Sequence, residues 1–184
     1  MKKSTQIWAS TNLDVSTFRN GDLVPEAITN YEWEKAGVKH SPAWCYYDND
    51  PANNAKYGKL YNWYAVNDPR GLAPAGWHIP SDSEWTKFIK TIGGKDNAGK
   101  KMKNTYGWND NGNGDNSSGF AGLPGGFRAY NGYYLNAGDF GYWWSSSEYN
   151  SFSSWYRILY CSYIFIYRDF YFKGYGMSVH CLKD

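Results

Sequence analysis

Residues 76–94 read "GWHIPSDSEWTKFIKTIGG" and hold the most clearly patterned element of the chain. Pro80 precedes Ser81, a residue type favoured at helix N-caps, and Glu84 three positions later completes a capping-box pattern. The apolar residues that follow share one helix face: Trp85, Phe88, Ile89 and Ile92. A glycine pair then ends the pattern. The sequence predicts an amphipathic helix that begins at Ser81 and packs on a core.

On the N-terminal side, short strand patterns alternate with turn residues. "IWASTNLDVSTF" (7–18) predicts a strand, and Asn20-Gly21 follows it as a turn. "ITNYEWEKAG" (28–37) predicts a short helix or a turn. "WCYYDNDPANNAKYG" (44–58) predicts a strand that runs into a polar loop, and "KLYNWYAV" (59–66) predicts a second aromatic strand or a short helix.

On the C-terminal side, a long Gly/Asn-rich loop (107–119) precedes "FAGLPGGFRAYNGYYLNAG" (120–138). This second segment predicts a hairpin, with Asn131-Gly132 at its turn. At least two more strands follow, and we expect "GMSVHCLKD" (176–184) to pair with the N-terminal strand. The chain therefore predicts a single loop-rich α+β domain over residues 1–184, with two short helices and small antiparallel sheets.

The composition excludes several classes of protein. The 184 residues suffice for one domain with a core, and the formal net charge of +2 comes without a long run of either sign, so we expect no nucleic-acid partner. The mean hydropathy is −0.70 and no segment reaches the roughly 18 consecutive apolar residues of a membrane helix, so we expect no direct membrane insertion. "MKKSTQIWASTNL" has two lysines but no apolar stretch behind them, so we expect no signal peptide in this chain.

The three cysteines, Cys45, Cys161 and Cys181, form no CxxC spacing. We therefore expect no zinc site and at most one disulfide. Cys45 and Cys181 are the candidate pair, and a buried thiol at each position is the alternative.

Six motifs occur in an order and spacing that resemble a known family. They are "IWASTNL", "GKLYNWYAV", "GLAPAGWHIPSDSEW", "GFAGLPGGFR", "GYWWSSSE" and "GMSVHCLKD". Together they resemble the Fibrobacter succinogenes major paralogous domain, which is common in Bacteroidetes and related to the formylglycine-generating-enzyme branch of the C-type lectin fold. The resemblance runs from about Ile7 to Asp184. It implies a C-type-lectin-like fold with paired terminal strands, two helices and a C-terminal sheet.

The resemblance also separates scaffold from variable positions. It implies that the following residues belong to the core or the capping scaffold: Trp77, Pro80, Trp85, Trp143, Trp144 and Glu148. Near the C-terminus the chain keeps the family positions Trp155, Arg157, Leu159, Arg168, Lys173, Gly176, Ser178, Val179 and Cys181. It departs at Met177, where Phe is usual, and at His180, where Arg is usual.

The residues between those positions have a shared coding property. Residues 149–175 hold twelve aromatic residues in 27 positions. Every residue type there, apart from Trp155 and Lys173, is reachable from an Asn codon by changing only its adenines. This segment therefore resembles the variable region of a diversity-generating retroelement, in which adenine-specific mutagenesis rewrites the end of a C-type-lectin-fold gene. An ordinary Tyr-rich aromatic face is the alternative.

The predicted function is binding. Tyrosine brings a large contact area, few torsions to freeze and a hydroxyl group, as in antibody paratopes. We expect a receptor-recognition protein, displayed on a phage particle or on the surface of a gut bacterium, that binds a protein or glycan ligand on a cell surface. The expected contact residues are Tyr149, Phe152, Tyr156, Ile158, Tyr160, Tyr163, Phe165, Tyr167, Phe170, Tyr171, Phe172 and Tyr175. Among these, Phe165 and Ile158 are the first expected to point inward.

Two other classes of function are open to the sequence. An undiversified cell-surface carbohydrate-binding domain would use the same rings, and calcium would then need clustered oxygens. "WNDNGNGDN" (108–116) supplies Asp110, Asn113 and Asp115, although such loops more often serve turns. An enzyme is the third class, but Cys161 and Cys181 do not reproduce the cysteine pair of the formylglycine-generating branch. We therefore expect no catalysis and no cofactor.

Overall fold

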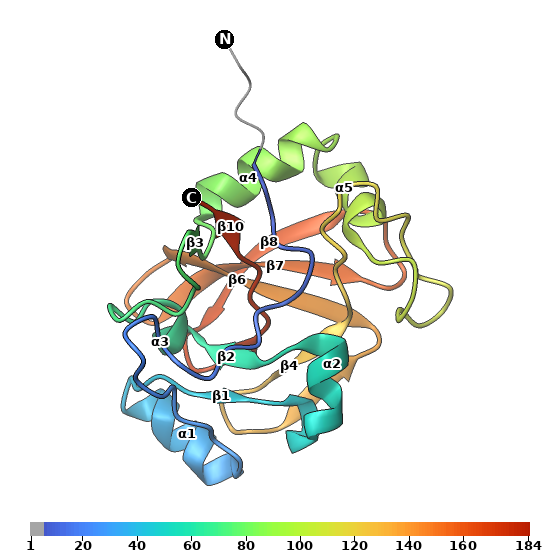
Figure 1. Ribbon diagram of the computed structural model, residues 1–184. Coiled ribbons are helices and arrows are strands. Elements are labelled where there is room, and N and C mark those ends of the chain that lie inside the picture. The colour runs from blue at the N-terminus through green and yellow to red at the C-terminus, as the bar shows by residue number, and fades with distance from the viewer. Residues whose placement is uncertain (1–5) are drawn as a thin grey trace.

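The structure is a computed structural model that describes residues 6–184. Its main feature is a mainly antiparallel sheet of eight strands in the order β1-β2-β9-β4-β6-β7-β8, with β5 beside β4 (Figure 1). The strands of this sheet are β1 (Trp44–Cys45), β2 (Leu60–Asn62), β4 (Gly125–Arg128), β5 (Tyr134–Ala137), β6 (Phe140–Glu148), β7 (Ser153–Tyr160), β8 (Ile166–Phe172) and β9 (Gly176–Met177). β3 (Trp77–His78) and β10 (Leu182–Lys183) form a separate pair.

The helices are short, and the three longest lie at two ends of the molecule. Figure 1 shows α4 (Asp82–Thr91) and α5 (Lys95–Met102) above β6, β7 and β8, and α1 (Asn30–Val38) at the opposite end. Single helical turns form α2 (Asn54–Tyr57) and α3 (Trp63–Val66), and 3-10 turns occupy Tyr47–Asn49 and Pro51–Asn53. The α+β class is confirmed, but there are more helical segments than the two expected.

The predicted helix begins as its sequence indicates. Ser81 accepts a hydrogen bond from the Glu84 backbone N–H, and the Glu84 carboxylate accepts one from the Ser81 backbone, so the capping box of α4 is complete. The side chains of Trp85, Phe88 and Ile89 are buried. α1 has the same device, built from Thr29 and Glu32, so the 28–37 segment is a helix.

α5 was not predicted from the sequence. It begins at Gly94 without a side-chain cap, and its buried residues are the small or flexible Ala98, Gly99 and Met102. A Cβ on Gly99 would lie 2.7 Å from the backbone oxygen of Ile164, which only glycine avoids. Tertiary packing against the chain before β8 therefore fixes this helix, and a weak apolar pattern does not reveal it.

Two predicted pairings are present. β4 and β5 form the expected antiparallel hairpin, and Gly132 in its turn has a positive φ of 91°. The N-terminal segment pairs with the end of the chain through a bridge between Trp8 and Leu182, and the backbone N–H of Ala9 donates to the Cys181 carbonyl. The predicted strand over 7–18 was wrong, because this segment makes only isolated bridges, at Trp8 and at Thr17, and no continuous ladder.

The core lies on both faces of β6 and β7. One face carries Trp144 and Tyr156 into the largest apolar cluster, and the other carries Trp143 and Leu159 into the cluster beneath α4 and α5. Side chains alternate between the faces of a strand, so a strand buried on both faces has apolar residues throughout. The near-continuous burial of β7, from Ser153 to Leu159 with only Trp155 half-buried, follows from this position inside the sheet.

The cysteines are all free, so of the two alternatives for Cys45 and Cys181 the buried thiol is confirmed and the disulfide is not formed. Cys45 and Cys181 are buried in different apolar clusters. Burial raises the pKa of the Cys45 thiol to about 11 and that of Cys181 to about 12. Both behave as small apolar side chains, as the alternative expected.

Among residues 6–184, no helix combines the length and apolar character needed to span a bilayer.

Candidate binding face

The aromatic segment 149–175 forms the last hairpin of the sheet, β7 and β8. β7 lies between β6 and β8, whereas β8 is the edge strand. The register pairs Tyr156 with Asp169 and Ile158 with Tyr167. The side chains of Tyr167, Asp169 and the nearby Tyr171 therefore lie on the same face of the sheet as those of Tyr156 and Ile158. They belong to the edge strand, however, and are less buried than the side chains of the inner strand.

The structure leaves half of the twelve predicted contact residues exposed. Six of them are at least two-fifths exposed: Tyr149, Phe152, Tyr163, Tyr167, Phe170 and Phe172. Tyr160, Phe165 and Tyr171 are half-buried. These side chains lie in three places on the surface, which differ in neighbours and shape.

The first place is a ring cluster at the β7–β8 turn, which we call the turn cluster: Tyr160, Tyr163, Phe165 and Tyr167. The Tyr163 and Phe165 rings are stacked with centroids 4.7 Å apart, and Phe165 meets Tyr167 edge-on at 4.6 Å. The ammonium group of Lys103 supports the turn from below, because it donates to the carbonyls of Tyr160, Cys161 and Tyr163. The rings are thus held against one another on an anchored turn.

The second place is an open groove of about 590 Å³ between α1 and the end of β8, which we call the α1 groove. The aromatic segment supplies one wall, with Phe152, Tyr171, Phe172 and Tyr175. The other wall comes from Glu34, Gly37, Val38, His40, Tyr64 and Tyr130. Its volume lies within the roughly 300–1,000 Å³ of ligand pockets.

The walls of the α1 groove are held in place by close contacts. A Cβ on Gly37 would lie only 3.5 Å from the Gly174 Cα, so α1 and the turn after β8 touch there. The Tyr171 and Tyr175 rings have centroids 4.1 Å apart, and the His40 and Tyr64 rings stack at 4.9 Å. The far wall was missed from the sequence, because its residues come from separate segments that only the fold brings together.

The third place lies toward α4. The Tyr149 and Phe170 rings stack with centroids 3.8 Å apart, and Trp155 meets Tyr149 edge-on at 4.8 Å. The Arg168 guanidinium lies 3.3 Å above the centroid of Trp155. Tyr149 and Phe170 therefore form a packed platform that leaves two-fifths of each ring in solvent.

Three predicted contacts are corrected by the structure, since Tyr156, Ile158 and Tyr175 are each less than a tenth exposed. They lie in the apolar cluster that also holds Trp144 and Phe127. Ile158 was expected to turn inward and does so, whereas Phe165 was expected inward and is half-buried. The reason is the strand: Ile158 belongs to the inner strand β7, and Phe165 precedes the edge strand.

Burial makes three phenols of the hairpin harder to ionise. Burial raises the pKa of Tyr160, and it raises the pKa of Tyr156 and Tyr175 far above the usual value for tyrosine. These three phenols therefore keep their protons and can each donate a hydrogen bond as well as accept one.

Charged residues fix the hairpin to the rest of the domain. The Asp82 carboxylate binds both Arg157, at 2.8 Å, and Arg168, at 2.9 Å. The Lys173 ammonium donates to Glu148 at 2.7 Å and lies 4.7 Å from the centroid of the Trp63 ring. Asp82 opens helix α4, so the buried Arg157 ties β7 to the helix that the capping box positions.

Among these anchors, Glu148, Arg157, Arg168 and Lys173 are positions that the resemblance assigned to the scaffold. A family model, described as the Fibrobacter succinogenes major domain, matches residues 1–183. The chain belongs to that family. No curated protein and no solved structure matches it. In this member of the Fibrobacter succinogenes major domain family, the expected scaffold residues Trp85, Trp143 and Trp144 are fully buried.

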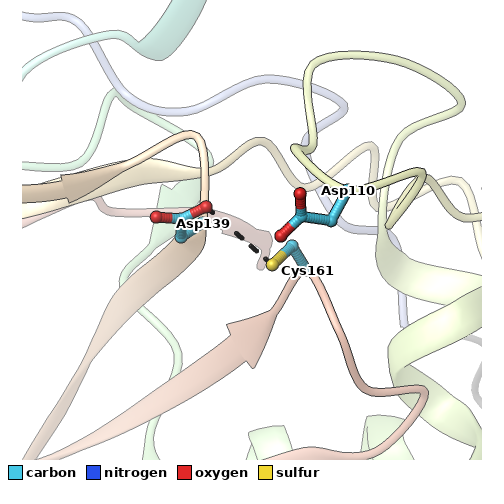
Figure 2. Close-up of side chains that lie close together, drawn as sticks. All are labelled: Asp110, Asp139 and Cys161. Atoms are coloured by element: carbon cyan, nitrogen blue, oxygen red, sulfur yellow. Dashed lines mark hydrogen bonds between the residues drawn. The ribbon is translucent and has the colours of Figure 1, made fainter.

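The predicted calcium ligands serve as turn residues in this family member. The Asn113 side chain accepts from the Trp108 N–H, and Asp115 accepts from the Ser117 N–H. Asp110 lies instead near Asp139 and Cys161, with their ligand atoms within 4.8 Å of one another (Figure 2).

The Cys161 thiol faces Asp139 at 3.9 Å in that trio. Calcium takes oxygen ligands, and a thiol among two carboxylates does not suit it. The trio therefore does not replace the predicted calcium site.

Proposed function

We propose that this protein is a binding protein without catalytic activity, in a C-type-lectin-like fold, whose outward aromatic residues between 149 and 175 recognise a macromolecular ligand. Its place is the surface of a phage particle or a bacterium, and its ligand is a protein or glycan on another cell surface. We further propose that a diversity-generating retroelement rewrites this segment. The proposal requires no cofactor.

One observation carries the proposal: in the C-terminal segment most of the retained family positions are buried, whereas most of the positions between them are not. The retained family positions are buried in all but two cases, the half-buried Trp155 and the exposed Arg168. Of the other positions between 149 and 175, all but six are exposed or half-buried, and the six buried ones are Ser153, Ser154, Tyr156, Ile158, Ile166 and Tyr175. A diversified site needs this division, because its variable residues must change without loss of the core.

The outward rings also have the physical properties of a binding surface. They stand on a strand hairpin held by Asp82, Glu148 and Lys103, so little conformational entropy is lost when a ligand binds. Exposed apolar patches of this kind commonly mark interaction sites. A few central rings are expected to supply most of the binding energy.

A second candidate is a fixed carbohydrate-binding site. The stacked His40 and Tyr64 rings and the exposed Tyr130 ring favour it, since ring faces in the α1 groove offer platforms for a sugar. A glycan array probed with and without EDTA tests this candidate, and binding that survives EDTA would assign it to the rings and not to calcium.

The proposal is tested by sequencing the 3′ end of the gene and its flank across a population of the source organism or phage. We expect a nearby reverse transcriptase and template repeat, with substitutions at adenine positions concentrated at the outward residues. An invariant 3′ end without such a flank would reject diversification and leave the aromatic face as a fixed site.

A further inference from the structure

The cations of the aromatic hairpin are all occupied. Arg157 and Arg168 share the Asp82 carboxylate, and Lys173 is buried against Glu148. The nearby Lys103 is buried under the turn cluster and donates to three carbonyl oxygens. None of these groups is free to meet an anionic ligand on the surface.

Two acidic groups of the same surface, Glu34 and Asp169, form no ion pair in the part of the chain that the structure describes. None of the ion pairs within residues 6–184 involves Glu34 or Asp169. Both side chains are exposed. Glu34 lines the α1 groove, whereas the α1 lysines Lys35 and Lys39 line a separate hollow on the other side of the helix.

The α1 groove therefore combines aromatic rings with an unpaired carboxylate. Its lining holds the rings of Tyr64, Tyr130 and Tyr171, and Glu34 is the free charge among its described residues, because Lys173 is neutralised. A second free carboxylate, Asp169, stands on the edge strand between the α1 groove and the turn cluster.

We infer that the ligand of this surface is a protein segment with an exposed arginine or lysine side chain, and that this side chain enters the α1 groove with Glu34 as its counter-charge. The inference rests on the proposed function and names the chemistry of its ligand. Asp169 attracts further basic residues of the same segment.

The physical basis is the pairing of cations with ring faces. A guanidinium or ammonium group within about 6 Å of a ring centroid is attracted by the ring quadrupole, and the alkyl stem of the side chain packs on apolar surface. The protein already uses this pairing internally, with Arg168 over Trp155 at 3.3 Å and Lys173 over Trp63 at 4.7 Å. A neutral sugar would leave Glu34 without a partner, and an anionic ligand would be repelled by it.

The test compares two short peptides, acetyl-GRSRG-amide and the same peptide with citrulline in place of arginine. Citrulline keeps the shape of arginine and lacks its charge. Backbone amide shifts are followed by NMR as each peptide is titrated into the full chain. We expect the arginine peptide to shift residues around the α1 groove, among them Val38, Tyr64 and Gly174, and to bind about threefold to tenfold more tightly than the citrulline peptide.

Two variants connect the effect to the counter-charge. Glu34→Gln should weaken binding of the arginine peptide by about threefold or more and leave the citrulline peptide unchanged. Asp48→Asn is the matched control, because Asp48 is acidic, lies outside the α1 groove and has a positive φ of 54° that asparagine tolerates. This control should bind both peptides as the unmodified chain does.

Equal binding of the two peptides, shifts outside the α1 groove, or no shifts with either peptide would overturn the inference. Each of these results leaves the proposed function to be judged by the population sequencing. Variable 3′ ends together with any of these results would retain a diversified binder and reject its basic ligand.

Discussion

Strands β7 and β8 are neighbours in one hairpin and both carry several aromatic residues, yet one lies inside the sheet and the other at its edge. β7 lies between two strands and buries residues on both faces, whereas β8 is the edge and leaves Tyr167 and Phe170 in solvent. The paired residues show the contrast directly: Arg157 is buried and its cross-strand partner Arg168 is exposed. The same residue types therefore build the core in one strand and the candidate binding face in the next.

The largest expected effect comes from the inner strand. Tyr156→Ser should lower the free energy of unfolding by about 3–4 kcal/mol, because a buried ring is replaced by a cavity. Tyr167→Ser on the edge strand is the matched control and should change stability by less than about 0.5 kcal/mol. Urea unfolding of both variants checks the pair, and similar losses in both would abolish the distinction between the strands.

The ion cluster gives the next largest effect. Asp82→Asn should cost about 3 kcal/mol, because it leaves the buried Arg157 guanidinium without its carboxylate. Arg168→Gln removes only the exposed partner of the same carboxylate and should cost about 0.5 kcal/mol. Chemical denaturation of the two variants measures the difference, and a larger loss for Arg168→Gln would contradict the assignment of Arg157 as the anchor.

The burial of His180 also predicts that the free energy of unfolding depends on pH. His180 is fully buried, stacks on Phe120 with centroids 4.0 Å apart, and burial lowers its pKa to about 3. Below the unfolded-state pKa of about 6.5, only the unfolded chain takes up this proton. The free energy of unfolding should therefore decrease as the pH is lowered, and at pH 5 it should be about 2 kcal/mol smaller than at neutral pH. This loss continues until the pH approaches the folded-state pKa.

The control for His180 is His180→Phe, which keeps a ring on Phe120 and does not titrate. Its stability should lack that slope between pH 6.5 and 5, measured by urea unfolding across the range. His78 titrates in the opposite sense: burial lowers its pKa, but hydrogen bonds to Asp184 and Glu84 outweigh burial and raise it. Because His78 is present in both chains, the difference between them isolates His180, and parallel curves would reject its burial as the cause.

The smallest effect belongs to the outward rings. Phe172→Ser, in the wall of the α1 groove, should change the free energy of unfolding by less than about 0.5 kcal/mol, because that side chain is 58% exposed. Thermal unfolding checks this value. A loss comparable to that of Tyr156→Ser would mean that the aromatic face belongs to the core.

Local signals made much of the fold predictable. The capping box at Ser81, the hairpin turn at Asn131-Gly132 and the pairing of the two chain ends all follow from residues close in sequence or from the family resemblance. Helix α5 lacked such a signal, because its contact with the chain at Ile164 is long-range.

The site was less predictable, because burial depends on strand order. Nothing in the sequence distinguishes Tyr156 from Tyr167 until β7 is placed inside the sheet and β8 at its edge. The far wall of the α1 groove, including His40 and Tyr64, comes from chain segments that carry no aromatic run of comparable length. Its Glu34 has no local pattern that separates it from an ordinary helix surface residue.

The most direct test of the central claim compares two display libraries made with NNC codons, which encode the residue types reachable from an Asn codon. One library varies the outward residues together: Tyr149, Phe152, Tyr163, Tyr167, Phe170 and Phe172. The other varies buried or anchoring residues: Trp155, Arg157, Leu159, Lys173, Ser178 and Val179. The fraction of clones that resist protease is measured in each. The account predicts that most clones of the first library fold and few of the second do, and equal fractions would contradict it.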